Sequence, residues 1–237
     1  LQDPVRQAIG RRSPALEVLE RTSAALDLGW VVSVDLVCGL PGQTMAGAVE
    51  DIRSLAALGV DGFSLYELLI FNQNRCWAAR MGLIERSHLP NYWTFLAGAQ
   101  ALSRLGYGKN LFNHWAGPRD RNVYFTFPVR GEDCLAVGTL ADGVFGNYHY
   151  RHAGLAQYLR ASGSGFAGLE GGLRRNAAEE VRLPLTQAVL SGTVGAGMAG
   201  SLREGWLACG LVETGEAGEL RLTGSGSWFA GSMVAVG

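Results

Sequence analysis

Lysine, closely spaced cysteines and long hydrophobic runs are scarce or missing in this sequence of 237 residues. Lys109 is the single lysine, although the chain has 20 basic residues, 21 acidic residues and a formal net charge of -1. This balance provides no basic surface for nucleic acid or for an anionic membrane. No apolar run approaches the roughly 20 residues of a membrane span, and no charged and then apolar leader opens the chain. We therefore expect a cytoplasmic protein with no nucleic-acid partner and no membrane span.

The cysteines are too far apart in the sequence to form a familiar metal or disulfide pattern. Cys38, Cys76, Cys134 and Cys209 include no C-x-x-C pair. This spacing disfavours a closed zinc site and a disulfide framework, so we expect reduced thiols and no metal site formed by this chain alone. Charged residues make up only 17% of the chain, against roughly 25% in an average protein, so we expect further structure to cover part of its surface.

The first 71 residues alternate between helical and extended patterns. Ser13 and Pro14 read as an N-cap and a first helical position, and Gly29 ends that helix. The β-branched run 31–37 then reads as a strand, and Thr44 caps a second helix that ends at Gly59. A second strand follows over 62–71. Strand, helix and strand at this spacing predict a βαβ unit and therefore a parallel sheet.

One acid lies in the first of these strands. Asp35 shares a face with Ser33, whereas Val34 and Leu36 lie on the opposite, wholly apolar face. In a barrel the polar face would be the interior, and the exit loop 39–42 would lie at the carboxyl end, where α/β barrels place their active sites. The pattern equally allows Asp35 to cap the loop or to pair with an arginine.

The rest of the chain reads as mixed α and β structure. We expect a helix over 88–108, a half-buried strand over 122–130, and a small-residue strand from 134 that continues into a glycine and aromatic loop. Helical pieces follow from 153, and the chain closes with two short strands around a glycine turn and a helix, which is a winged-helix-like outline. His88 and His114 have no identifiable partners and are assigned structural roles.

Several segments together resemble a known enzyme family. They are "AIGRR", "VDLVCGLPGQT", "LGVDGFSLYEL", the "NYW" helix and the closing "LRLTGSGSWFAGSMV". The combination resembles the oxygen-independent coproporphyrinogen III dehydrogenases, which are radical S-adenosylmethionine (SAM) enzymes and include heme chaperones and anaerobic heme-degrading methyltransferases. The resemblance implies an α/β fold: the C-terminal part of a partial (β/α)6 radical SAM barrel and a small α+β, winged-helix-like C-terminal domain. We expect barrel units over 1–72, a connecting region over 73–150 and the C-terminal domain over 151–237.

The resemblance also implies cofactors and a cofactor site. SAM and a [4Fe-4S] cluster are expected, but the sequence contains no C-x-x-x-C-x-x-C motif. We therefore expect the cluster ligands in a missing N-terminal part, an electron donor such as flavodoxin, and a fragment that is inactive alone. The family's SAM contacts fall on Arg11, or Arg12 if the register slips by one, on Asp35, and on Leu69 through its backbone.

The substrate implied by the resemblance is a tetrapyrrole, either heme or coproporphyrinogen III. We expect the loop residues Tyr148, His149, Arg151 and His152 to lie over it, because Tyr and His can ligate heme iron and Arg pairs with carboxylates; a solvated polar loop is the alternative. The preferred function is anaerobic heme utilisation or degradation. Coproporphyrinogen III decarboxylation, non-catalytic heme trafficking and a generic α/β interaction domain remain alternatives.

Overall fold

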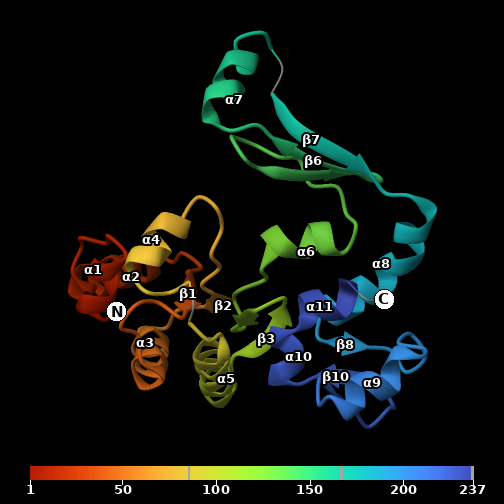
Figure 1. Cartoon of the computed structure of the whole chain (residues 1–237), viewed down its shortest axis with the longest axis horizontal. Coiled ribbons are helices and arrows are strands. Elements are labelled where there is room, and N and C mark those ends of the chain that lie inside the picture. The colour runs from red at the N-terminus through yellow and green to blue at the C-terminus, as the bar shows by residue number, and fades with distance from the viewer. Residues whose placement is uncertain (85, 166–167, 236–237) are drawn as a thin grey trace.

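The computed structural model describes residues 1–84, 86–165 and 168–235, and Figure 1 shows their arrangement. A four-stranded sheet in the order β1-β2-β4-β3 forms the centre of the N-terminal half. The elements of this half are α1 (Asp3–Ala8), α2 (Ala15–Asp27), β1 (Ser33–Cys38), α3 (Met45–Ala57), β2 (Gly62–Glu67), α4 (Arg75–Arg80), α5 (Leu89–Arg104), β3 (Gly108–Leu111), β4 (His114–Ala116) and α6 (Val123–Val129).

The predicted βαβ unit is confirmed. β1 and β2 pair in parallel, with Asp35 opposite Ser64, and α3 connects them. The Thr44 side chain accepts a hydrogen bond from the backbone N–H of Gly47 and so caps α3, as the sequence predicts. The strand bounds differ slightly, because β1 begins at Ser33 and β2 already ends at Glu67. The N-cap of α2 is Pro14 and not the predicted Ser13.

The helices α3 and α5 cover one face of this sheet. They enclose an apolar core that includes Ile52 of α3, Phe63 and Leu65 of β2, and Phe95 of α5, all at most 1% exposed. Because side chains alternate along a strand, Ser64 and Tyr66 lie on the opposite face of β2. The apolar face predicted for the first strand therefore lies beneath α3 and α5, and the polar face is the opposite one.

The half-buried strand predicted over 122–130 is wrong, because residues 123–129 form the helix α6. The backbone N–H groups of Thr126 and Arg130 donate to carbonyl oxygens four residues earlier, and the Thr126 hydroxyl also donates to the Asn122 carbonyl oxygen. A short apolar run does not by itself distinguish a strand from a helix, since a strand depends on a partner supplied by tertiary structure.

A second sheet, with the strand order β5-β6-β7, projects away from the main body together with α7 (Figure 1). Residues 148–152, predicted as a loop, are strand β6, which pairs with β5 across the Gly146-Asn147 turn. This two-residue turn, followed by alternating side chains, was the sequence signal for a hairpin. The elements are β5 (Asp142–Phe145), β6 (Tyr148–His152), α7 (Leu155–Ser162) and β7 (Leu169–Arg174).

The C-terminal region packs against α5. The Tyr92 hydroxyl of α5 lies 2.7 Å from Ser225 Oγ, and the ring of Trp228 packs edge-on against Phe95. The predicted closing hairpin is confirmed as β9 and β10, and the helix predicted after it is divided into α10 and α11. The elements are α8 (Ala177–Leu190), β8 (Thr193–Val194), α9 (Leu202–Ala208), β9 (Val212–Thr214), β10 (Leu220–Leu222), α10 (Gly224–Trp228) and α11 (Ala230–Ala235). Within the described ranges, no helix is long and apolar enough to cross a membrane.

Candidate functional site

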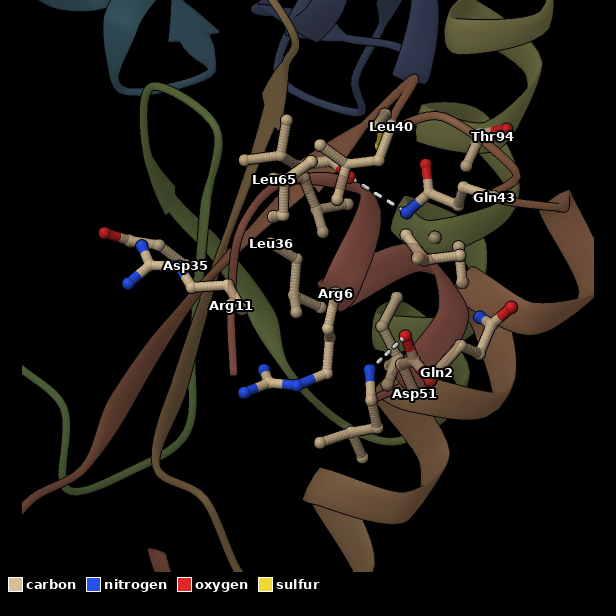
Figure 2. Close-up of a pocket in the computed structure, with 18 of the residues that line it drawn as sticks. Gln2, Arg6, Arg11, Asp35, Leu36, Leu40, Gln43, Asp51, Leu65 and Thr94 are labelled. Atoms are coloured by element: carbon tan, nitrogen blue, oxygen red, sulfur yellow. Dashed lines mark hydrogen bonds and ion pairs between the residues drawn. The ribbon is translucent and has the colours of Figure 1, made fainter. Parts of the chain in front are cut away.

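A pocket of about 400 Å³ lies between α1, β1, α3 and α5. Arg11 and Asp35 both line it, and Figure 2 shows them on the opposite side of the view from Gln43 and Thr94. Two of the three predicted cofactor residues are therefore brought to the same pocket. Its other walls are mainly apolar and include Val5, Ile9, Val18, Leu36, Val37, Leu40, Ile52 and Leu65.

Asp35 is exposed, on the face of β1 opposite Val34 and Leu36. It lies opposite Ser64 of β2, and the Asp35 carboxylate adds to the effect of burial in raising the pKa of the nearby Tyr66. Among the residues that the structure describes, Asp35 has no ion-pair or hydrogen-bond partner. In the described residues, Asp35 therefore neither caps the loop nor pairs with an arginine.

The loop after β1 is held by Gln43 and not by Asp35. The backbone N–H of Gly39 donates to Gln43 Oε1 at 2.8 Å, and Gln43 Nε2 donates to the Val37 carbonyl oxygen at 2.9 Å. Gly39 has a φ of 97°, a conformation that side-chain-bearing residues rarely adopt. The glycine and the glutamine of "GLPGQ" therefore fix the turn that leads out of the strand.

The other predicted cofactor residues lie elsewhere. Arg12 is exposed and, unlike Arg11, does not line the pocket. Leu69 follows the end of β2, is 52% exposed, and does not line the pocket either. Its carbonyl oxygen accepts a hydrogen bond from Asn74 Nδ2 at 2.9 Å. The structure thus does not bring Leu69 together with Arg11 and Asp35.

The four predicted substrate residues do not converge on one point, because β6 divides them between its two faces. Tyr148 and His152 alternate with His149 and Arg151 along the strand. His152 is buried, and its Nδ1 lies 2.7 Å from the Gly138 carbonyl oxygen. His149 Nε2 accepts a hydrogen bond from Arg175 at 2.6 Å, and burial together with this guanidinium lowers the pKa of His149.

Arg151 and His149 both line a broad groove on this sheet. Arg151 is within 4 Å of two carboxylates, at 3.6 Å from Asp142 and 3.7 Å from Glu170. The groove also contains the backbone of Gly143, Gly171 and Gly172. Because Arg151 is exposed and already faces two acids, it is only partly available to a carboxylate of a ligand.

Sequence reasoning missed two histidine networks. His88 Nδ1 donates to Glu67 Oε1 at 2.5 Å. His114 lies between Ser64 Oγ at 3.0 Å and Asp120 Oδ2 at 2.8 Å. The partners of each histidine lie on other elements, so no local motif indicated them.

The cysteines do not form a cluster site in the described ranges 1–84, 86–165 and 168–235, where no three His, Cys, Asp or Glu side chains are grouped as metal ligands. Cys38 is buried at the pocket wall, and burial, together with the Glu67 carboxylate, raises the pKa of its thiol to about 12. A thiol of this kind stays protonated, whereas iron–sulfur clusters are bound by thiolates. The residues present therefore do not fit a [4Fe-4S] cluster.

The chain is similar in sequence to a curated protein and in fold to a solved structure. No family model matches the chain. A curated protein named anaerobilin synthase, from Escherichia coli O157:H7, is 30% identical over 126 residues, which cover 50% of this chain and 27% of that protein. The solved structure of coproporphyrinogen III oxidase (HemN) from Escherichia coli, described as a radical SAM enzyme, superimposes with a TM-score of 0.75 at 16% identity.

The structural match covers 99% of this chain and 61% of HemN, so the chain spans only part of both proteins. At 16% identity, HemN establishes the fold alone, a mixed α/β fold of the HemN radical SAM type. The sequence match supports the resemblance independently over half of the chain. The chain therefore resembles, in sequence and in fold, a part of the HemN-like radical SAM family.

Proposed function

We propose that this chain is part of a radical SAM enzyme that acts on a tetrapyrrole in anaerobic heme utilisation or degradation. The observation that carries the proposal is the 30% identity with anaerobilin synthase. The HemN fold and the shared pocket of Arg11 and Asp35 support it. We further propose barrel units over 1–72, a connecting region over 73–150 and a winged-helix-like C-terminal domain over 151–237, although the β5-β6-β7 sheet includes residues on both sides of position 150.

The pocket residues fit SAM. An exposed guanidinium at Arg11 can pair with the carboxylate of the methionyl part, because arginine binds carboxylates through two parallel hydrogen bonds. The Asp35 carboxylate has no partner among the described residues and can accept hydrogen bonds from an ammonium or hydroxyl group. The apolar wall offers a surface for an adenine ring. When bound, SAM supplies the group that is cleaved to start radical chemistry.

No step is assigned to an iron–sulfur cluster here, because the described cysteines do not form its site. In the proposal, the cluster ligands and the docking site of an electron donor such as flavodoxin belong to protein outside this sequence. The chain's own contribution is to orient SAM through Arg11 and Asp35 and to present a surface to the tetrapyrrole. Contacts made by Leu69 to SAM, and by Tyr148, His149, Arg151 and His152 to the tetrapyrrole, stay predictions.

Coproporphyrinogen III decarboxylation is the second candidate, because the fold match is to a coproporphyrinogen III oxidase over nearly the whole chain. Heme trafficking without catalysis is a third possibility that shares the tetrapyrrole ligand. These functions differ in substrate, so titrations with hemin and with coproporphyrin III, a stable analogue of the reduced substrate, separate the first two. We expect tighter binding of hemin; tighter binding of coproporphyrin III would favour the second candidate.

The SAM site is tested by calorimetric titration of SAM into the chain. We expect Asp35→Asn and Arg11→Ala each to weaken binding by about tenfold, the cost of losing one charge-assisted contact of roughly 1.4 kcal/mol. Arg12→Ala is the matched control, because Arg12 is an exposed neighbouring arginine outside the pocket. Equal affinities for all four proteins would remove the SAM site from the proposal.

A further inference from the structure

A path of hydrogen bonds runs from a buried acid to the polar face of β2. Asp120, in the segment after β4, accepts a hydrogen bond from His114 Nε2 at 2.8 Å, and His114 Nδ1 lies 3.0 Å from Ser64 Oγ. Ser64 is also hydrogen-bonded to Tyr66, which lies two residues further along the same strand and therefore on the same face. Side chains from β2, β4 and the segment after β4 thus form one connected path.

The path begins in the protein interior and ends beside the candidate cofactor site. The side chains of His114 and Asp120 are 5% and 8% exposed, whereas Tyr66 is half-buried. Asp35 of β1 is in register with Ser64, and it lines the pocket. Burial raises the pKa of the Tyr66 phenol, the hydrogen bond with Ser64 lowers it, and the nearby Asp35 carboxylate raises it. Tyr66 therefore lies next to the residue that we assign to SAM.

The chemistry of each partner decides where the protons of the path lie. The Asp120 carboxylate only accepts hydrogen bonds, and it also accepts one from the backbone N–H of Asn122, so His114 Nε2 carries a proton. His114 Nδ1 accepts from the Ser64 hydroxyl when the ring is neutral and donates to it when the ring is an imidazolium. Because a hydroxyl group both donates and accepts, Ser64 fits either form. His114 can therefore gain or lose a proton without breaking the path.

The same residue types form the triad of serine hydrolases, but the burial of Ser64 excludes that role here. A nucleophilic hydroxyl must reach the carbonyl carbon of a substrate. Ser64 is 4% exposed, and its hydroxyl lies between His114 and Tyr66. The member of the path that a ligand can reach is therefore the half-buried Tyr66, and Ser64 is an intermediate.

Resting on the proposed tetrapyrrole function, we propose that Tyr66 is an acid–base group that meets the bound ligand and exchanges protons with His114 through Ser64. When the relay delivers a proton, the Tyr66 phenol protonates a basic atom of the tetrapyrrole. The Ser64 hydroxyl then reprotonates Tyr66, and the Nδ1 proton of the His114 imidazolium passes to Ser64. One proton crosses the path, no electrons move, and His114 is left neutral with its Nε2–H still bonded to Asp120. Asp120 is a positioning residue.

The test is the rate at which the imidazole protons of His114 exchange with water, measured by NMR at constant pH on a chain with isotope-labelled histidine. The signal of His114 is identified by its absence in His114→Gln. We expect Tyr66→Phe and Ser64→Ala each to slow this exchange by about tenfold or more, because each removes a hydroxyl group that carries the proton. Ser64→Thr keeps the hydroxyl and should restore the exchange.

A network with a merely structural role predicts the opposite sign. Loss of a hydrogen bond would then loosen the buried ring, and the exchange would become faster or stay unchanged. Tyr107→Phe is the matched control, because the Tyr107 hydroxyl donates to the Val60 carbonyl oxygen at 2.6 Å and lies outside the path. We expect wild-type exchange at His114 in this variant. Chemical denaturation of each variant shows that it is folded and that slower exchange does not come from greater stability.

A second arm tests whether Tyr66 meets the ligand. Iron-free coproporphyrin III at saturation should slow the exchange at His114 in the wild type, because it covers the phenol, and should have no effect in Tyr66→Phe. Exchange in Tyr66→Phe as fast as in the wild type would overturn the relay and leave the proposed function standing. Bound coproporphyrin III without any effect on the wild type would overturn the contact with Tyr66. A chain that binds neither hemin nor coproporphyrin III would overturn the tetrapyrrole function, and the exchange in Tyr66→Phe would still decide the relay.

Discussion

Ser64 and His114 face each other across the antiparallel pair β2 and β4, with Ser64 Oγ 3.0 Å from His114 Nδ1. The second nitrogen of His114 reaches Asp120 Oδ2 at 2.8 Å, and Asp120 also accepts a hydrogen bond from the backbone N–H of Asn122. All three side chains are buried, and Asp120 rests directly on Gly62. The network joins the segment after β4 to the first residues of β2.

We predict that Asp120→Ala lowers the free energy of unfolding by about 2 kcal/mol, because it leaves the buried Nε2 of His114 without its hydrogen-bond partner. Chemical denaturation measures the change. Asp27→Ala is the control, since Asp27 is exposed and has no partner among the described residues. If both variants lose the same stability, the network has no special role.

Gly62→Ala tests the same contact from the strand. A Cβ atom at Gly62 would lie 1.8 Å from Asp120 Oδ2, so either Asp120 or the backbone must move. We expect a loss of stability similar to that of Asp120→Ala, and a double variant no worse than the poorer single variant, because both remove one interaction. Additive losses would contradict this interpretation.

The pH dependence of stability should report on Lys109. Its Nζ is buried without a hydrogen-bond partner in the described structure, and burial lowers the pKa of Lys109 from 10.5 to about 8. Between these pH values the unfolded chain binds the proton and the folded chain does not, so the free energy of unfolding rises with pH over that window. The gain is at most about 3 kcal/mol.

Lys109→Met should remove this rise, because methionine fills similar space without a charge. The difference between wild type and variant, measured by urea denaturation from about pH 8 to pH 10.5, isolates this group from other titrating residues. Arg104→Met removes an exposed cation as a control. A wild-type stability curve that runs parallel to that of Lys109→Met would show that the amine is not held neutral.

Thiol reactivity should differ sharply among the cysteines. Cys76 and Cys209 are exposed, whereas Cys38 is 4% exposed and burial raises the pKa of its thiol to about 12. Since the thiolate is the reactive form, we expect a thiol reagent to modify Cys76 and Cys209 while Cys38 stays unmodified in the folded chain. Mass spectrometry after timed alkylation reads each site. Early modification of Cys38 would mean that the pocket wall opens.

The edge of the main sheet is a predicted site of self-association. β1 is the terminal strand in the order β1-β2-β4-β3, and Trp30 and Val31 just before it are 64% and 52% exposed. An open strand edge beside apolar residues favours pairing between chains. We expect light scattering to show association that grows with concentration and weakens in Val31→Lys. A monomer at high concentration would contradict this expectation.

Local sequence signals were reliable where one element carries its own start, period and stop. The βαβ unit follows from the β-branched run before Gly39, the Thr44 cap and Gly59. The helix with Pro90 near its start and Gly106 after its end follows in the same way. The strand predicted around residues 123–129 was wrong, because its strand-like alternation had no partner strand to stabilise it.

The sequence by itself determined the alternation of strands and helices, the polar face that carries Asp35, and the resemblance to a HemN-like protein, because these depend on neighbours along the chain. Only the tertiary structure decided that Arg11 and Asp35 share a pocket, that Leu69 does not, and that His88 has a carboxylate partner. Glu67 and His88 lie on different elements, so their hydrogen bond exists only once α5 packs on β2. Contacts of this kind depend on packing, which no local pattern encodes.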